Sequence, residues 1–253
     1  KASNMCARLS DYTVWCWGQG DNGMLGNSNI VPCNINDPNV TQGGFVCYKK
    51  YSATPVQVKV TFPNGTETTQ FNQVFSNSFV ACVLNGVSLF CWGDTYVFGP
   101  NIHTANEDHS VPKQVGSFVN FKNIYLGPYS VCMVGVGDGG LGYCRGDSNL
   151  GRLGNGLDTA TNATDKEILY NIKSNIKFKY IKPAATKACG LSEDNQIYCW
   201  GNAGTQKTGL GVTDLAVSNV PVLAHQGLRF KNLSCSNNDI CGGQPESGSY
   251  IYW

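Results

Sequence analysis

The chain has 253 residues, a formal net charge of +1 and only 14% charged residues. This balance gives no general attraction to nucleic acid or to an anionic membrane, and no apolar run approaches the roughly 18 residues needed to cross a bilayer. With 30 glycines and 10 prolines, the composition predicts many short elements joined by turns rather than long helices.

The first predicted element is a β-hairpin near 6–17, which ends in the phrase Cys-Trp-Gly. The segment before it, Lys1–Met5, lacks an apolar signal region, so we expect a mature or trimmed chain. The phrase recurs along the chain, in most copies with a glycine-rich loop and a Leu-Gly pair after it. Repetition in register indicates a unit of architecture. We therefore expect equivalent hairpins near 82–92, 132–145, 189–200 and 241–253.

Two further marks support this frame. A phenylalanine stands 11 residues before the first cysteine of a unit in four of the five units, and a proline precedes a valine-rich strand in three. The connection after the first hairpin is 22 residues longer than the next one, which predicts an inserted loop at about 32–53.

One position of the repeat holds a tryptophan or its substitute, at intervals of 75, 53, 55 and 53 residues. A small sheet cannot bury both of its faces alone, so stacked sheets must cover each other, and a large side chain can fill the seam between them. A carbohydrate-stacking role for the Trp-Gly pair has less weight, because repetition in register indicates architecture. The expected seam residues are Trp17, Trp92, Arg145, Trp200 and Trp253.

Twelve cysteines, mostly in pairs about ten residues apart, favour disulfides over a metal. Structural zinc sites use closely spaced cysteine pairs, which this sequence lacks. Across a hairpin, directly opposite cysteines lie at about the separation that a disulfide needs. In the last unit Tyr252 replaces the second cysteine, which leaves Cys241 in frame for the off-frame Cys235. The predicted disulfides are Cys6–Cys16, Cys33–Cys47, Cys82–Cys91, Cys132–Cys144, Cys189–Cys199 and Cys235–Cys241.

Four N-glycosylation sequons agree with an oxidising compartment, where disulfides form and persist. We therefore expect an extracellular glycoprotein, secreted or at the cell surface. The expected glycan acceptors are Asn39, Asn64, Asn162 and Asn232.

Two motifs in the middle of the chain suggest chemistry but fit the repeat better. Gly135–Gly140 matches a dinucleotide-binding fingerprint by letter, yet no helix follows, so we interpret it as a glycine-rich hairpin turn. Arg145–Asp147 matches an adhesion tripeptide, but Trp92–Asp94 holds the same register with Gly-Asp in place. We expect a strand end there rather than an exposed loop tip.

The lysine-rich segment Ile172–Lys182 alternates lysines with apolar residues, which predicts a half-buried strand with a solvated lysine face. Binding of a sulfated or acidic glycan is the alternative. Asp21, Asp138 and Asp147 stand in glycine-rich turns without the regular ligand spacing of a known calcium site. No set of nucleophile, base and carboxylate is recognisable, so we predict no catalytic residue, no metal and no cofactor, and no enzymatic activity.

The repeat resembles that of the regulator of chromosome condensation family, whose units carry an apolar strand, Trp-Gly, a Gly-rich loop with Leu-Gly, and then proline and a valine-rich strand. Asp194–Gly211 and Tyr12–Asn27 carry the pattern most clearly, whereas Ser88–Pro100 has lost the Leu-Gly pair. The resemblance covers nearly the whole chain and implies an all-β fold, a β-propeller of about five repeats. The cysteines resemble those of the secreted branch, such as the ectodomains of plant crinkly-type receptor kinases. The nuclear exchange-factor activity of the family is not expected here, because its partner-binding residues have no recognisable matches.

Propellers of this family usually close seven blades, whereas five hairpins are visible here. Either a five-bladed ring closes with one thin blade, or the ring is incomplete and leaves strand edges that invite pairing with another chain. We expect one propeller domain over 1–253, possessing a deficient blade that a strand from a neighbouring chain completes.

The predicted function is that of a non-enzymatic structural or protein-interaction module, a self-assembling filament or coat subunit. The alternative is a ligand-binding ectodomain fragment of a cell-surface receptor, followed by a secreted inhibitor or lectin-like binder. The expected partners are other protein chains, including copies of itself, and N-linked glycans. We expect neither nucleic-acid binding nor insertion into a membrane.

Overall fold

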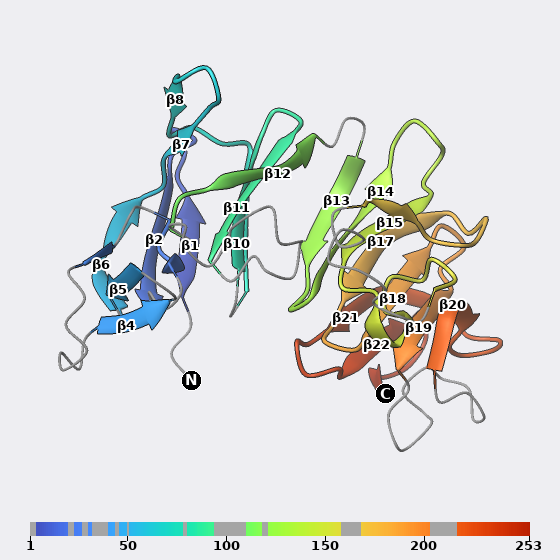
Figure 1. Ribbon diagram of the computed structural model, residues 1–253. Coiled ribbons are helices and arrows are strands. Elements are labelled where there is room, and N and C mark those ends of the chain that lie inside the picture. Colours follow the sequence, from blue (N-terminus) through green and yellow to red (C-terminus); the bar gives the residue numbers. More distant parts are fainter. Residues whose placement is uncertain are drawn as a thin grey trace. The chain divides into compact units, whose positions relative to one another are not determined.

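The structure is a computed structural model, and it describes residues 4–19, 23–26, 30–31, 40–43, 46–49, 51–77, 80–93, 110–117, 121–157, 168–202 and 217–253. In these residues the fold is all-β, with η3 (Asn149–Gly151) as a short 3-10 turn (Figure 1). The predicted fold class is therefore confirmed.

Five antiparallel sheets carry the repeated hairpins, and we call them blades 1 to 5. Their strands, in hydrogen-bonded order, are β1 (Met5–Arg8), β2 (Val14–Gln19) and β6 (Tyr51–Gln57) in blade 1; β9 (Gln73–Ser76), β10 (Val80–Asn85), β11 (Ser88–Gly93) and β12 (Lys113–Ser117) in blade 2; β13 (Phe121–Leu126), β14 (Ser130–Gly135), β15 (Gly142–Gly146) and β16 (Tyr170–Asn171) in blade 3; β17 (Phe178–Pro183), β18 (Lys187–Ser192), β19 (Ile197–Asn202) and β20 (Val217–Leu223) in blade 4; and β21 (Phe230–Cys235), β22 (Cys241–Pro245) and β23 (Ile251–Tyr252) in blade 5.

Within the described residues, two small sheets lie outside the blades. The first has the order β3 (Ile30–Val31), β5 (Val46–Lys49), β4 (Val40–Gly43), and the second is the hairpin of β7 (Val60–Thr61) and β8 (Glu67–Thr68). The insertion expected at about 32–53 thus contributes β4, β5 and the start of β6.

The register of the hairpins follows from the cysteine spacing. In blades 1 to 4 the two cysteines of the hairpin are directly opposite each other, with Cα atoms 4.1 to 4.2 Å apart. This short separation is that of a non-hydrogen-bonded antiparallel pair, whose side chains point to the same face of the sheet.

Blade 5 departs from the frame that the Phe-to-Cys spacing predicts. In blade 4, Lys182 follows Phe178 by four residues and faces Cys189. In blade 5, Ser234 follows Phe230 by four residues but faces Gly242, because the connection from β21 to β22 is one residue longer. Gly242 therefore occupies the place of the first hairpin cysteine, with Tyr252 opposite it. The expectation that Cys241 stands in frame is wrong by one residue. Cys241 instead exchanges two backbone hydrogen bonds with Trp253.

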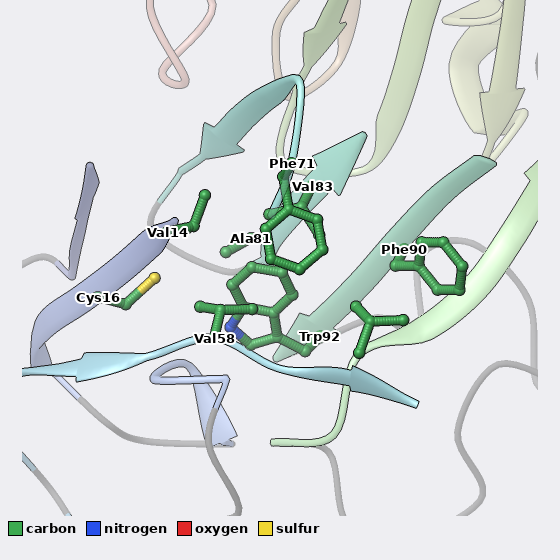
Figure 2. Packing of buried hydrophobic residues seen from close by; sticks show 9 residues of the cluster. Val14, Cys16, Val58, Phe71, Ala81, Val83, Phe90 and Trp92 are labelled. Atoms are coloured by element: carbon green, nitrogen blue, oxygen red, sulfur yellow. The ribbon is translucent and has the colours of Figure 1, made fainter. Parts of the chain in front are cut away.

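The chain divides into two compact units, Lys1–Val119 and Asn120–Trp253, which we call unit 1 and unit 2. The core of unit 1 lies between blades 1 and 2, where Phe71 packs close to the indole of Trp92 (Figure 2). Unit 2 has one core between blades 3 and 4, around Phe178 and Trp200, and another between blades 4 and 5, around Phe230. In both units, hydrophobic burial between successive sheets is thus the main stabilising contact. A single domain over 1–253 stays a prediction.

Candidate functional site: blade seams and an open strand edge

Two seam tryptophans bind the loop of the preceding blade. The indole Nε1 of Trp92 donates to the carbonyl oxygen of Met24 at 3.1 Å, and that of Trp200 donates to the carbonyl oxygen of Arg152 at 3.0 Å. Both side chains are fully buried. Each acceptor stands two residues before the glycine of a Leu-Gly pair, so the tryptophan of one blade recognises the loop of the blade before it.

The glycine of each Leu-Gly pair is required by this contact. Gly26 and Gly154 have φ of +69° and +66°, in the left-handed region that other residues rarely adopt. A Cβ on Gly26 would lie 2.6 Å from the indole of Trp92, and one on Gly154 would lie 2.8 Å from that of Trp200. Trp-Gly and Leu-Gly therefore recur at matched spacing because each supplies one side of the same packing contact.

The other three predicted seam residues occupy the equivalent strand position with different surroundings. Trp17 pairs with Met5 and is half-buried, and Arg145 pairs with Val131 and is 8% exposed. Trp253 lies with its ring centroid 4.8 Å from that of His225, and its buried indole nitrogen has no hydrogen-bond partner among the described residues. Their seam role stays a prediction.

Among the described residues, five disulfides join pairs that the sequence predicts: Cys6–Cys16, Cys82–Cys91, Cys132–Cys144, Cys189–Cys199 and Cys235–Cys241. Cys33 lies outside the described residues, so its pairing with Cys47 stays a prediction.

A group of sulfur atoms lies between blades 4 and 5. The Sγ atoms of Cys189, Cys235 and Cys241 all lie within 4.8 Å of one another. All three belong to disulfides, and a disulfide sulfur lacks the thiolate that a metal ion needs. In the described part of the chain we find no other group of potential metal ligands.

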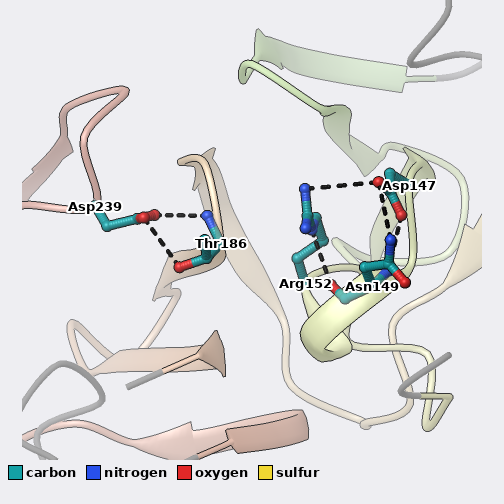
Figure 3. Close-up of polar contacts among 5 residues, drawn as sticks. All are labelled: Asp147, Asn149, Arg152, Thr186 and Asp239. Atoms are coloured by element: carbon teal, nitrogen blue, oxygen red, sulfur yellow. Dashed lines mark hydrogen bonds and ion pairs between the residues drawn. The ribbon is translucent and has the colours of Figure 1, made fainter. Parts of the chain in front are cut away.

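The adhesion-like tripeptide is part of the scaffold. The Asp147 carboxylate accepts a hydrogen bond from the backbone N–H of Asn149 at 2.9 Å and lies 3.9 Å from the guanidinium of Arg152 (Figure 3). Arg152 is only 6% exposed and donates from Nε to the Asn149 carbonyl oxygen at 2.8 Å. Burial lowers the pKa of Arg152, and Asp147 opposes this shift. Because Arg145 is also buried, the tripeptide is not presented at an exposed tip.

A polar contact between Thr186 and Asp239 joins blades 4 and 5. Thr186 donates from its backbone N–H and its hydroxyl to the two carboxylate oxygens of Asp239, at 2.7 and 2.9 Å (Figure 3). The neighbouring Lys187 is 3% exposed and donates to the carbonyl oxygen of Trp253 at 3.4 Å. Burial lowers the pKa of Lys187, and Asp239 raises it. These charged groups thus stabilise the contact between two blades.

The glycine-rich segment Gly135–Gly140 forms a hairpin turn between β14 and β15, as expected. Its Asp138 accepts hydrogen bonds from the backbone N–H of Leu141 at 3.0 Å and from the hydroxyl of Tyr143 at 2.6 Å. The tyrosine hydrogen bond is the main cause of the lowered pKa of Asp138.

The lysine-rich segment is less solvated than the alternation predicts. Lys173 and Lys177 are exposed, but Lys179 and Lys182 are half-buried. Lys179 donates to the Asn195 side-chain oxygen at 2.5 Å, and the ammonium of Lys182 lies 3.3 Å from the ring centroid of Tyr125. Lys177, although exposed, donates to the Asp138 carbonyl oxygen at 2.6 Å, so three of the four lysines make contacts inside unit 2.

The described sequons differ in their surroundings. Asn64 is exposed in the turn between β7 and β8, and its Oδ1 accepts hydrogen bonds from the N–H and hydroxyl of Thr66 at 3.1 and 2.7 Å. Asn232 lies half-buried within β21, where its Oδ1 accepts from the backbone N–H of Gln244 at 3.2 Å. Asn39 and Asn162 lie outside the described residues.

The second hairpin strand of blade 5 differs from its equivalents at its outer edge. In each of blades 1 to 4 a further strand covers this edge. In blades 1 to 4 the second hairpin cysteine faces a residue of a further strand, namely Val56, Lys113, Tyr170 and Val222 respectively. Tyr252 holds the same position, and no strand among the described residues pairs with its outer side. The missing cysteine at Tyr252 is a sequence signal for this difference, but it does not show the open edge.

The ring of Tyr252 is 68% exposed and stacks with that of Tyr250, which is 43% exposed, at a centroid distance of 5.9 Å. Among the described residues, the outer edge of blade 5 therefore faces no strand and carries two exposed aromatic rings; we call it the open edge of blade 5. In the described residues no helix is long and apolar enough to span a membrane.

No protein-family model matches the chain. Human E3 ubiquitin-protein ligase HERC2 is 22% identical over 203 residues, which are 79% of this chain and 4% of HERC2. The structure of human WBSCR16 superposes with a TM-score of 0.71 at 18% identity, over 99% of this chain and 59% of that one.

Yeast RCC1 (Prp20), in its crystal structure with Kap60, superposes with a TM-score of 0.66 at 17% identity, over 99% of this chain and 54% of that one. This chain thus spans little more than half of either solved protein. Membership of the crinkly-type secreted branch stays a prediction. The two superpositions, with the repeated hairpins and their seam contacts, show that the chain has the β-propeller fold of RCC1 (Prp20) and WBSCR16.

Proposed function

We propose that this chain is an extracellular, non-enzymatic interaction module that binds a further strand along the open edge of blade 5. Copies of the chain supply that strand to one another, so that the protein assembles into a filament or coat. The observation that carries this proposal is the outward backbone of Tyr252, which faces no strand among the described residues, whereas its equivalents in blades 1 to 4 are all paired.

The backbone geometry favours strand addition. Trp253 exchanges both of its backbone hydrogen bonds with Cys241, so the N–H and C=O of the adjacent Tyr252 point away from β22. An unpaired edge of this kind is a template for another chain, and proteins that avoid pairing protect it with charge, with proline or with a very short edge strand. The edge strand here, Ile251–Tyr252, is short but has neither charge nor proline, and Tyr252 supplies one outward N–H and C=O pair.

Three features support an extracellular, non-enzymatic role. The five disulfides favour an oxidising compartment. The exposed Asn64 offers a site for an N-linked glycan. The buried Arg152 and the half-buried Asp147 and Asp239 of unit 2 are engaged in contacts of the scaffold. Yeast RCC1 (Prp20), which shares the fold, is bound to the protein Kap60 in its crystal structure.

A proline substitution tests the role of the edge. Tyr252→Pro removes an N–H that points outward and leaves the hydrogen bonds between Trp253 and Cys241 in place, so blade 5 remains paired. Tyr252→Ala is the matched control, since it removes the ring but keeps the N–H. We expect sedimentation velocity over a range of concentrations to show association of the wild type and of Tyr252→Ala. Association of Tyr252→Pro should be at least about tenfold weaker, equal to about 1.4 kcal/mol.

Electron microscopy of the wild type distinguishes the forms of assembly. Ordered filaments or sheets support the filament or coat subunit. A wild type that stays monomeric at all concentrations, with fast hydrogen exchange at the Tyr252 amide, contradicts strand addition and favours the receptor-ectodomain alternative.

A further inference from the structure

A pocket of about 370 Å³ lies in unit 1, where the turns of blade 1 and blade 2 meet. Its lining residues are Tyr12, Gln70, Phe71, Asn72, Asn85 and Gly86. We propose that this pocket binds a neutral saccharide, with Tyr12 as the stacking ring and Asn72 and Asn85 as the hydrogen-bonding groups. This site is separate from the open edge of blade 5, and the proposal does not depend on strand addition.

Tyr12 is held in a strained and exposed position. It lies in the turn between β1 and β2 with φ of 70°, a left-handed conformation that is unfavourable for a residue with a side chain. The turn is fixed by hydrogen bonds from Leu9 N–H to the Thr13 carbonyl oxygen at 2.8 Å and from Tyr12 N–H to the Leu9 carbonyl oxygen at 3.1 Å.

The ring of Tyr12 gains little from burial, since the residue is 54% exposed. The guanidinium carbon of Arg8 lies 4.8 Å from the ring centroid and covers one face of the ring, which leaves the other face for a ligand. Backbone strain is concentrated at functional sites, and an exposed aromatic ring at a pocket rim is a surface on which a ligand can stack.

The two asparagines have fixed orientations with groups to spare. Asn72 Oδ1 accepts a hydrogen bond from the Gly86 N–H at 2.6 Å, so its amide NH₂ remains as a donor. Asn85 Nδ2 donates to the Gln70 carbonyl oxygen at 2.9 Å, so its side-chain oxygen remains as an acceptor. The pocket therefore presents a donor and an acceptor whose positions are set before a ligand arrives.

The two blades hold the pocket together through their backbones. The N–H of Phe71 donates to the Tyr12 carbonyl oxygen at 2.8 Å, and Thr13 forms a β-bridge with Gln70. A pocket that is formed in advance avoids part of the ordering cost of binding.

The chemistry of the lining selects the ligand class. None of the lining residues is charged, so the lining itself presents only neutral groups to a ligand. The guanidinium of Arg8 is the cation next to the pocket, on one face of Tyr12, and the comparison of neutral with anionic glycans tests its influence. Neighbouring hydroxyl groups of a sugar each donate and accept, which matches an amide NH₂ beside an amide oxygen. The C–H face of a pyranose ring can stack on Tyr12. The volume is at the lower end of roughly 300–1,000 Å³ for ligand pockets, which suits a mono- or disaccharide end group.

The test uses an array of neutral and anionic glycans, followed by calorimetric titration of the best neutral oligosaccharide into the whole chain. We expect binding of neutral glycans by the wild type, and at least a tenfold loss of affinity in Tyr12→Gly and in Asn72→Asp. Tyr12→Gly removes the ring and relieves the left-handed strain, so its melting temperature should not fall. Asn72→Asp keeps the oxygen that accepts from Gly86 but loses the NH₂.

Asn175→Asp, at an exposed position of unit 2, is the matched control for the added charge, and Val136→Ala is the control for loss of an exposed apolar side chain; both should bind as the wild type does. The proposal is overturned if no neutral glycan on the array binds, if only anionic glycans bind, or if binding survives in Tyr12→Gly. Loss of binding in the two control variants would also overturn it.

Discussion

Gly154 allows the indole of blade 4 to pack closely against the loop of blade 3. At Gly154 the positive φ of +66° and the approach of the Trp200 indole both exclude a side chain, whereas Gly227 in the same unit has φ of +77° and no atom within 4 Å of the place that a Cβ would take. A substitution at Gly227 therefore tests backbone strain alone, whereas one at Gly154 tests backbone strain together with packing against Trp200.

Gly154→Ala should destabilise the protein more than Gly227→Ala. Each substitution places alanine in the left-handed region, which costs about 1–2 kcal/mol. Gly154→Ala adds overpacking against Trp200, for a further ~1–3 kcal/mol. Urea unfolding of both variants measures the difference, and equal losses would contradict the seam contact.

The surroundings of an asparagine decide whether it can carry a glycan in the folded protein. Asn64 uses only its Oδ1 within the turn, and the residue is exposed, whereas the side chain of Asn232 in β21 hydrogen-bonds Gln244 of β22. On secretion from a eukaryotic host we expect a glycan at Asn64 and none at Asn232.

Peptide mass spectrometry after glycosidase treatment measures the occupancy at each site. Asn64→Gln should remove a glycan, and Asn232→Gln should leave the pattern unchanged. A folded, secreted protein with a glycan at Asn232 would contradict this prediction.

At the scale of the strands, blade 5 replaces a disulfide by aromatic packing. Where blade 4 has Cys189–Cys199, blade 5 has Gly242 facing Tyr252, and a Cβ on Gly242 would lie 2.5 Å from the tyrosine ring. Beside this pair, His225 packs on Trp253 and Phe230 with ring centroids 4.8 and 5.8 Å away. Because His225 lies in this apolar cluster, we expect the contact between blades 4 and 5 to be sensitive to acid.

Burial lowers the pKa of His225 below its usual value of 6.5. The unfolded chain therefore takes up a proton before the folded one, so the free energy of unfolding should fall as the pH drops below 6.5, until the lower folded pKa is reached. His225→Phe keeps a ring and should weaken this dependence. Urea unfolding between pH 7.5 and pH 5 measures both slopes, at roughly neutral to mildly acidic conditions; equal slopes would contradict the assignment.

Local sequence patterns predicted the hairpins, because cysteine spacing and turn residues act over a few residues. They predicted the pairing of Cys235 with Cys241 as well. They missed the one-residue shift that puts Gly242 opposite Tyr252, since the length of the β21–β22 connection changes the register without changing the Phe-to-Cys interval. The strain at Tyr12 has no sequence signal, because left-handed tyrosines are imposed by their surroundings.

At the scale of the molecule, the two units repeat one plan. In unit 1 the indole of blade 2 meets the loop of blade 1, and in unit 2 the indole of blade 4 meets the loop of blade 3. The segment Ser88–Pro100, whose sequence lacks the Leu-Gly pair, lies largely outside the described residues. The sequence could predict this plan from the repeat, but the hydrogen-bond acceptors, Met24 and Arg152, follow only from the three-dimensional arrangement.

The contact between indole and loop has a direction, since one blade supplies the ring and the other supplies the carbonyl. A head-to-tail contact of this kind does not itself fix how many copies follow one another. A gene duplication that adds one complete repeat would regenerate the same contact on both of its sides, whereas an insertion of half a repeat would leave ring facing ring or loop facing loop. Gain or loss of a whole repeat is therefore the change in length that such a protein tolerates best during evolution.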